Sequence, residues 1–363
     1  MDNYKKYNIF LGISSLSRSI LDIFSSVFLY QKGYSIKNIM LFYAILYLFG
    51  IIVNIISLRI VKYINGKYIL ILSSLLFVYS FYYFNTISNN ITNLIIFSLL
   101  LSTSSYMYHS MRHYYAMEIL PKENKSSKTF LILIISYIPL IISPYIGGFI
   151  TDKYGLYITM IISGILSLIG IIPILKINIY KNLFKENKIT KVLKQIPRSK
   201  MTFFILEQFK VIFITLQPLY LYLYINKDLK YVGIFNIILG IASLICIYIF
   251  VKSIKINKHF LIINTIFTII LLLKLNIYNN TILLVLAFFE GLFLKIYETL
   301  SLTNIYNKDK SDIINYLSIC EIIFCLVRGL ICISCIFIQD IKIIMYIMIL
   351  GIFLSSFPKL DYN

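Results

Sequence analysis

Apolar blocks alternate with short polar segments along most of the chain. Each block has about 20 residues, which is enough for an α-helix to cross a hydrocarbon core of ~30 Å. The pattern therefore predicts an all-α membrane protein with about twelve transmembrane helices. They are expected near residues 7–30, 39–58, 68–86, 92–111, 129–150, 156–175, 201–224, 231–251, 259–277, 281–301, 313–337 and 341–357.

One long polar run interrupts this pattern near the middle of the chain. Residues 176–200 contain eight Lys or Arg and a single acid, Glu186. The run separates two sets of six blocks, which we expect to form two pseudo-symmetric six-helix bundles. The predicted division is an N-terminal bundle over 1–176, a basic linker over 177–200 and a C-terminal bundle over 201–363.

The Lys and Arg residues lie mostly on one side of the predicted membrane. On the side of the linker there are 23, on the opposite side there are 7, and four lie within spans. Cytoplasmic loops carry the excess of Lys and Arg in membrane proteins. The bias therefore predicts a multi-pass plasma-membrane protein whose linker and two termini are cytoplasmic.

Composition narrows the class further. Hydrophobic residues make up 59% of the 363-residue chain, more than one soluble core would bury. The formal net charge of +19 comes from short basic runs between apolar blocks, whereas a nucleic-acid site would need a continuous basic face. We expect a monomer whose partners are the lipid bilayer and a small-molecule substrate, with no nucleic acid and no cofactor.

Neither the cysteines nor the histidines predict a metal site. Cys332 and Cys335 form a CxxC inside an apolar block, with no second pair and no nearby histidine, which favours apolar filler. His109 and His113 have the i, i+4 spacing of a zinc site, but no acidic partners adjoin them. A role for these histidines in relaying protons fits better, since histidine titrates near neutral pH.

Ionisable and amide side chains are concentrated on a few predicted helices. Burying an ionisable group in a membrane costs ~2.5–3.5 kcal/mol, so such groups usually face the bundle interior or a water-filled path. The first, fourth, seventh and tenth helices carry most of them, and the eleventh adds two; Lys274 lies near the outer end of the ninth. The set is Arg18, Asp22, His109, Arg112, Glu207, Gln208, Lys210, Gln217, Glu290, Lys295, Glu298, Glu321 and Arg328.

The spacing of these residues puts opposite charges on shared helical faces. Arg18 precedes Asp22 by four residues, Lys295 precedes Glu298 by three, and Glu321 precedes Arg328 by seven. Each pair can therefore meet directly or line one surface. Ion pairs that only fix helix packing are the alternative, but they do not explain placement on every third helix.

Two further short motifs lie outside this set of residues within the predicted spans. In the turn after the second helix stand Arg59, Lys62, Gly66 and Lys67, with Glu118 available beyond the fourth helix. The fifth helix contains Pro139 and then the run Ser143-Pro144-Tyr-Ile-Gly147-Gly148. Proline removes a backbone hydrogen bond and glycine permits close helix approach, so this helix is expected to bend and pack tightly.

With these motifs the chain resembles the major facilitator superfamily over nearly its whole length. The turn resembles the family motif G-x-x-x-D-R/K-x-G-R/K-R/K, although Ser57 and Val61 stand in the Gly and Asp positions and Gly66 is displaced by two. The fifth helix resembles the family pattern G-P-x-x-G-G. The resemblance implies two six-helix bundles with helices 1, 4, 7 and 10 around a central cavity. The Arg that drug exporters of the family carry early in helix 4 is missing.

The favoured function is secondary active transport of a small polar solute by alternating access, coupled to protons. Asp22 and Glu290 are the leading coupling candidates, followed by Glu207 and Glu321. The balanced charges predict a charged cargo, such as an amino acid, a peptide, an organic anion or a phosphorylated metabolite. Alternatives are a multidrug or hydrophobic-compound exporter of the same fold, or a membrane enzyme or lipid-handling protein. Catalysis is disfavoured because long loops and catalytic motifs are missing.

Overall fold

The computed structural model describes residues 3–61, 63–119, 125–177, 198–250, 260–306 and 313–358, and these residues form helices and connections without strands. The first group of helices is α1 (Asn3–Asp22), α2 (Ser25–Gln31), α3 (Ile36–Ile60), α4 (Gly66–Thr86), α5 (Ile91–Ile119), α6 (Lys125–Tyr154) and α7 (Leu156–Leu175). The second group is α9 (Arg198–Tyr224), α10 (Leu229–Phe250), α11 (Phe260–Asn276), α12 (Asn280–Tyr306), α13 (Ile313–Ser334) and α14 (Ile341–Leu354).

The predicted all-α membrane fold is confirmed. Within the described residues, eight helical segments are long and apolar enough to cross a membrane. Helices α11 and α14 are apolar but shorter. Most of the basic linker cannot be compared with the structure, because residues 178–197 lie outside the described part of the chain.

The first span predicted over 7–30 is confirmed as one membrane span, Asn3–Gln31, but its helix is broken. Helix α1 ends at Asp22 and α2 begins at Ser25, so Ile23 and Phe24 interrupt the span. The Phe24 amide donates to Leu21 at 3.0 Å, and regular i, i+4 bonding resumes when the Phe28 amide donates to Phe24 at 2.8 Å. Sequence periodicity missed the break because the apolar residues continue through it.

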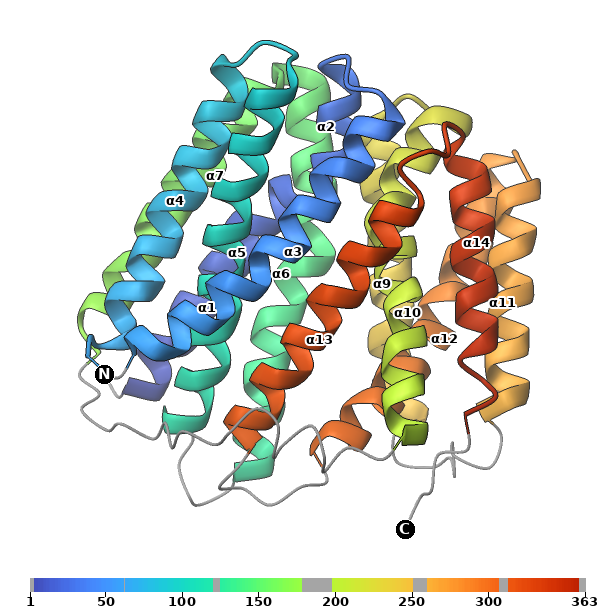
Figure 1. The fold of residues 1–363 in the computed structure, drawn as a ribbon. Helices are drawn as coiled ribbons and strands as arrows, with labels where there is room; N and C mark the ends of the chain where they lie inside the picture. Colours follow the sequence, from blue (N-terminus) through green and yellow to red (C-terminus); the bar gives the residue numbers. More distant parts are fainter. Residues whose placement is uncertain are drawn as a thin grey trace.

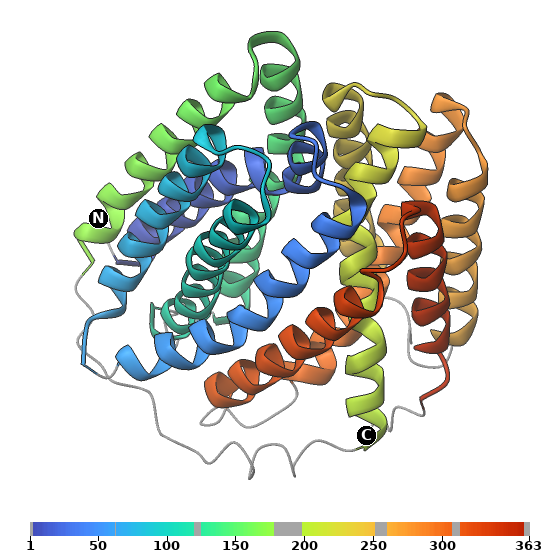
Figure 2. The same cartoon turned by 45° about the horizontal axis from the view of Figure 1, so that its top comes forward.

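The helices fall into two groups that lie side by side in both orientations (Figure 1, Figure 2). In the N-terminal group α1 packs on α6 and α7, and α5 packs on α3 and α4. In the C-terminal group α12 packs on α10 and α11, while α9 packs on α13 and α14. The groups meet mainly where α6 packs on α10, α3 on α13 and α2 on α9, and α5 also touches α13.

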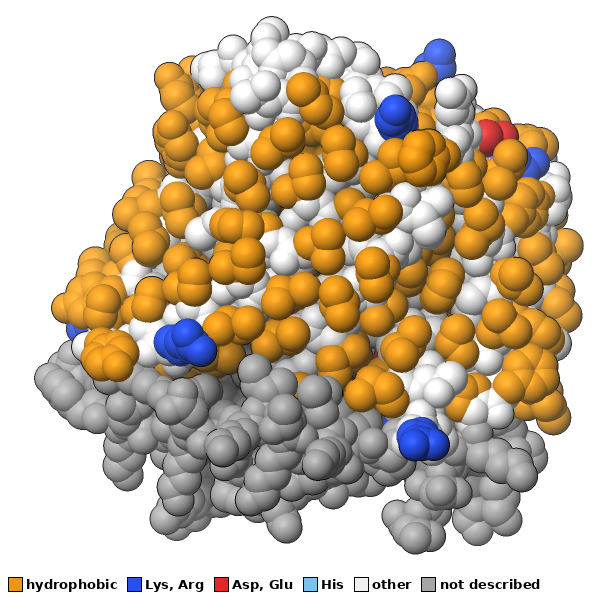
Figure 3. All heavy atoms as spheres, viewed as in Figure 1, with side chains coloured by type: hydrophobic (Ala, Val, Ile, Leu, Met, Phe, Trp, Pro, Cys, Tyr) orange, Lys and Arg blue, Asp and Glu red, His pale blue; other side chains and the backbone are white. Residues whose placement is uncertain are grey.

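The surface of the molecule fits a lipid environment. Exposed side chains include many Ile, Leu, Phe and Tyr, among them Ile165, Ile172 and Leu350. Figure 3 shows one face covered mainly by hydrophobic side chains, with Lys and Arg toward its two ends. Burial in a bilayer accounts for such a surface, because apolar contact with lipid replaces contact with water.

Polar residues set several of the helix ends. Ser35 accepts a hydrogen bond from the Asn38 amide at the start of α3, and Asp340 accepts one from the Lys342 amide at the start of α14. Lys32 donates to the carbonyls of Phe84, Asn85 and Ile87, where α4 ends. These contacts satisfy backbone groups that a helix terminus leaves free.

We call the end of the molecule with the short connections 32–35, 87–90, 225–228, 277–279 and 335–340 the distal end. The connection between α6 and α7 also lies there and consists of Gly155. Its φ of +85° is accessible to glycine at little cost, which allows the two helices to join through one residue. The opposite end is the proximal end.

Candidate functional site

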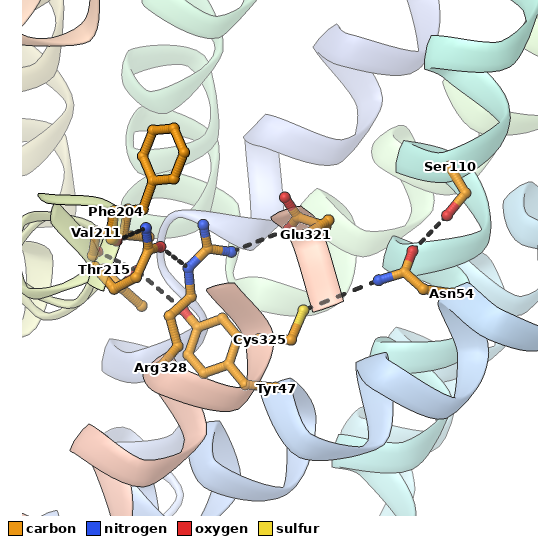
Figure 4. Close-up of polar contacts among 10 residues, drawn as sticks. Tyr47, Asn54, Ser110, Phe204, Val211, Thr215, Glu321, Cys325 and Arg328 are labelled. Atoms are coloured by element: carbon orange, nitrogen blue, oxygen red, sulfur yellow. Dashed lines mark hydrogen bonds and ion pairs between the residues drawn. The ribbon is translucent and has the colours of Figure 1, made fainter. Parts of the chain in front are cut away.

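Arg328 on α13 is the centre of a polar network between the two groups of helices. Its Nε donates to Oε1 of Gln208 on α9 at 2.8 Å, and its Nη1 donates to Oε1 of Glu321 at 3.2 Å. Glu321 lies two turns earlier on α13, as the i, i+7 spacing predicted. Figure 4 shows the Arg328 guanidinium and its bond to Glu321. Arginine therefore uses separate N–H groups to fix an amide and a carboxylate.

Tyr47 on α3 brings the N-terminal group to this network. The Arg328 guanidinium carbon lies 5.7 Å from the centroid of the Tyr47 ring. The Tyr47 hydroxyl lies 3.4 Å from Oγ1 of Thr215 on α9 (Figure 4). We call Arg328, Glu321, Gln208, Tyr47 and Thr215 the central network.

A second chain of contacts crosses between the groups beside it. Ser110 on α5 donates to Oδ1 of Asn54 on α3 at 2.5 Å. The Asn54 amide in turn approaches Sγ of Cys325 on α13 at 3.9 Å (Figure 4). Helices α3, α5, α9 and α13 therefore all contribute polar groups to the junction.

Partial exposure distinguishes the central network from the other ion pairs. The Glu321 side chain is 35% exposed and the Arg328 side chain 14% exposed. The Gln208 side chain is buried, and it also donates to the Phe204 carbonyl at 2.8 Å. The accessible part of the central network is therefore the Glu321 carboxylate and, to a smaller extent, the Arg328 guanidinium, while Gln208 holds Arg328 from the buried side.

Glu290 makes a different kind of contact, inside the C-terminal group. Its Oε2 accepts from Lys274 on α11 at 2.7 Å and from Gln217 on α9 at 3.2 Å. Lys274 also lies over Phe213 and Phe235, with its ammonium 4.6 and 5.4 Å from their ring centroids. These residues fasten α9, α11 and α12 together.

Glu207 and Lys210 pair along α9 itself. The Lys210 ammonium lies 3.0 Å from Oε1 of Glu207, and both side chains are largely buried. The pair occupies the i, i+3 spacing that lets opposite charges meet on one helix. Both residues have further contacts as well.

Arg18 and Asp22 share a face of α1 but form no ion pair within 4 Å in the described structure. Arg18 instead donates to the Ser73 carbonyl at 3.2 Å, and its guanidinium lies 4.7 and 4.4 Å from the ring centroids of Phe77 and Tyr108. Within the described residues, Nη1 of Arg18 and Oδ1 of Asp22 are buried and lack a hydrogen-bond partner.

The remaining predicted cavity residues are dispersed. His109 is exposed, with its ring 5.6 Å from that of Tyr108, and the Arg112 carbonyl accepts from the Tyr7 hydroxyl at 2.5 Å. Lys295 on α12 reaches across to α6, where its ammonium lies 4.5 Å from the centroid of the Tyr137 ring. The side chain of Glu298 lies outside the described residues, as does that of His113.

The two adjacent glycines of α6 face two different helices. A Cβ on Gly147 would lie 2.3 Å from the Ile20 carbonyl oxygen of α1, next to the break in that span. A Cβ on Gly148 would lie 2.4 Å from the Leu229 carbonyl oxygen of α10. Pro139 and Pro144 lie within the same helix. The sequence motif therefore permits close approach on both sides of α6.

The predicted gate turn is described only in part. Arg59 lies in the last turn of α3, and the Lys67 amide donates to Asn65 at the start of α4. A Cβ on Gly66 would lie 2.8 Å from the Tyr115 ring of α5, so a larger residue would have to displace that ring. Lys62 and the side chain of Glu118 lie outside the described residues.

Sequence reasoning missed the partners of several charges. Tyr47, Ser73 and Tyr108 were not selected because uncharged residues are abundant in every predicted span. Lys274 was assigned to a helix end, although its side chain is fully buried. The sequence did contain a signal for this burial, because Lys274 stands alone among apolar residues. A lysine in such surroundings needs a buried acid as its partner. Among the described residues, no group of three His, Cys, Asp or Glu is arranged to hold a metal ion.

Comparisons with known proteins agree with this architecture. Two similar solved structures are those of the nucleoside transporter NupG. A mutant of that transporter superposes with a TM-score of 0.75 at 13% sequence identity, covering 98% of each chain. Another NupG structure gives 0.72 at 12% identity, covering 100% of each chain. Comparison with curated proteins finds no match. A sequence model of the Major Facilitator Superfamily matches residues 8–308, so the chain belongs to this superfamily.

Proposed function

We propose that this protein is a secondary active transporter that moves a small polar solute by alternating access and is not an enzyme. The observation that carries the proposal is the central network. It places a partly exposed carboxylate and a guanidinium where α3, α9 and α13 meet, between the two groups of helices. A solute bound there would contact both groups of helices. Movement of one group relative to the other could then expose the solute first to one side of the membrane and then to the other.

The network also favours one kind of solute. Arg328 and Glu321 neutralise each other, and around them stand amide and hydroxyl groups and the aromatic ring of Tyr47. This combination suits a neutral solute with several hydrogen-bonding groups and a flat apolar face better than a strongly charged one. Nucleosides have these properties, and we include them as the first substrate class to test, together with the charged metabolites expected from the balanced charges in the sequence.

Proton coupling is part of the proposal, with Asp22 as the preferred group and Glu321 next. Among the described residues Oδ1 of Asp22 has no donor, so it accommodates a proton without breaking another contact. Glu290 already accepts two bonds through Oε2, and proton uptake would disturb them. This difference moves Glu290 below Asp22 as a coupling group.

The proposed topology has the distal end outside the cell and both termini on the cytoplasmic side of the plasma membrane. The excess of Lys and Arg on the side of the linker supports this orientation. We further propose that residues 1–176 and 201–363 move as two bodies within a monomer, joined by the basic linker 177–200.

A ligand screen followed by transport measurements tests the proposal. A solute that binds the folded protein raises its apparent stability, so purified protein is heated with nucleosides, amino acids, organic anions and phosphorylated metabolites. Hits are then tested for uptake and for countertransport in proteoliposomes with and without an inward proton gradient. Binding of hydrophobic cations alone, unaffected by Arg328→Ala, would favour an exporter of hydrophobic compounds. Chemical conversion of a hit without its translocation would favour an enzyme.

A further inference from the structure

Asp152 on α6 lies at the first turn of α10, a helix of the other group. Its Oδ2 accepts from the Lys230 amide at 2.7 Å, and its Oδ1 accepts from the Leu229 amide at 3.3 Å. These are the first two residues of α10. Amides in the first turn of a helix have no acceptor within the helix, and the partial positive charge there favours an anion. The carboxylate of one group thus caps a helix of the other.

Backbone packing brings the two helices together just below this contact. A Cβ on Gly148 of α6 would lie 2.4 Å from the Leu229 carbonyl oxygen. Conversely, a Cβ on Gly233 of α10 would lie 2.5 Å from the Tyr145 Cα. Because both helices have glycine at this contact, which we call the α6–α10 seam, they approach closely enough for the Asp152 carboxylate to reach the amides.

Charged residues of both signs adjoin the cap. The ammonium groups of Lys153 on α6 and Lys230 on α10 both lie 5.7 Å from the centroid of the Phe149 ring. Asp228, immediately before α10, also accepts from the Lys230 amide, but at the longer distance of 3.3 Å. The helix start therefore has an acceptor of its own, and the shorter bond nevertheless goes to Asp152.

We propose that Asp152 is a latch that holds the distal end closed and releases α10 when that end opens. The inference rests on the alternating-access part of the proposed function. A cap within one helix group would survive movement between the groups. Because this cap joins α6 to α10, separation of the groups at the distal end must break it, leaving two amides to find water or Asp228. Asp152 is exposed, so solvent weakens the contact and keeps it reversible.

A second contact at the same end supplies a matched control. The amide of Gln31 on α2 donates to the Tyr222 hydroxyl of α9 at 3.1 Å. It also joins the two groups, but it is one bond between neutral side chains. Hydrogen bonds to a charged group are stronger than neutral ones, so loss of Asp152 should loosen the distal end more than loss of Gln31.

Distance measurements between spin labels test the latch without a known substrate. Labels are attached through Tyr82→Cys at the distal part of α4 and Phe337→Cys before α14, both exposed positions away from the seam. The background has its five buried native cysteines replaced by alanine. In Asp152→Ala protein, the ratio of long to short distances should rise roughly tenfold. Asp152→Asn, which keeps an acceptor oxygen without the charge, should give a smaller rise, and Gln31→Ala the smallest.

The outcomes separate the latch from the wider proposal. A distance distribution like that of the unsubstituted protein in both Asp152→Ala and Asp152→Asn overturns the latch. If Asp152→Ala fails to fold, Asp152→Asn decides alone. If the unsubstituted protein and every variant give one short distance under all conditions, alternating access fails as well. Long distances that increase in the Asp152 variants but not in Gln31→Ala support the latch.

Discussion

The ammonium of Lys274 lies 2.7 Å from the carboxylate of Glu290, and both side chains are almost completely buried, at 0% and 1% exposure. The two residues come from α11 and α12, and the Lys274 ammonium lies over the rings of Phe213 and Phe235. An ion pair this deeply buried contributes to packing only while both charges are present, since a single buried charge is costly.

Glu290→Gln or Lys274→Met alone should therefore destabilise the C-terminal group by ~3–5 kcal/mol. The double substitution Lys274→Met with Glu290→Leu should recover most of that loss, because neither charge then remains. Thermal unfolding of the purified proteins in one detergent checks this order. Full stability of Glu290→Gln combined with loss of proton-driven uptake would instead return Glu290 to the coupling candidates.

We expect that solute binding needs the shape of the Arg328 guanidinium as well as its charge. Lysine carries one ammonium group and does not reproduce the separate bonds to Gln208 and Glu321. Arg328→Lys should therefore weaken solute binding roughly tenfold or more while the protein remains folded. Binding is measured as the ligand concentration that gives half the maximal thermal stabilisation.

A control for this substitution stands on the exposed surface. Arg59 lies in the last turn of α3, and Arg59→Lys keeps the charge at a position outside the central network. It should bind the solute like the unsubstituted protein. Equal binding by Arg328→Lys and Arg59→Lys would mean that the central network does not contact the solute.

Much of this fold was predictable because the thickness of the bilayer sets the length of apolar sequence that each spanning helix needs. The length of each apolar block and the side on which Lys and Arg gather fix the number of spans and the expected topology. The run from Pro144 to Gly148 also predicted that this helix packs closely against its neighbours. Backbone packing at Gly147 and Gly148 gives that pattern its physical cause.

Pairing within the membrane was harder to predict. The i, i+7 spacing of Glu321 and Arg328 identified a pair on one helix, because helix geometry alone determines it. Lys274 and Glu290 lie on different helices, and spacing along the chain does not reveal how those helices are rotated toward each other. Arg18 shows the same limit, since its neighbours Ser73 and Tyr108 come from two other helices.

Asp22 provides a test of proton coupling. Asp22→Asn keeps the size of the side chain and removes its capacity to take up and release a proton. We expect gradient-driven accumulation to be lost while exchange of labelled for unlabelled solute continues. Both are measured in proteoliposomes with the solute from the ligand screen.

Asp340→Asn is the matched control for this change. Asp340 caps α14 through the Lys342 amide, and asparagine caps a helix as well as aspartate does. It should retain accumulation. Accumulation that persists in Asp22→Asn and is lost in Glu321→Gln would move the coupling site to the central network.

The last prediction concerns Gly148, one of the two adjacent glycines of α6. A Cβ on Gly148 would come within 2.4 Å of a backbone oxygen of α10, so Gly148→Val should force α6 and α10 apart. Gly164→Ala on α7 is the control, because a Cβ there meets the Val78 side chain at an ordinary 3.4 Å. With the label pair at Tyr82 and Phe337, Gly148→Val should lengthen the distance across the distal end and Gly164→Ala should leave it unchanged. The idea that contact between α6 and α10 sets this closure fails if Gly148→Val keeps the short distance and full thermal stability.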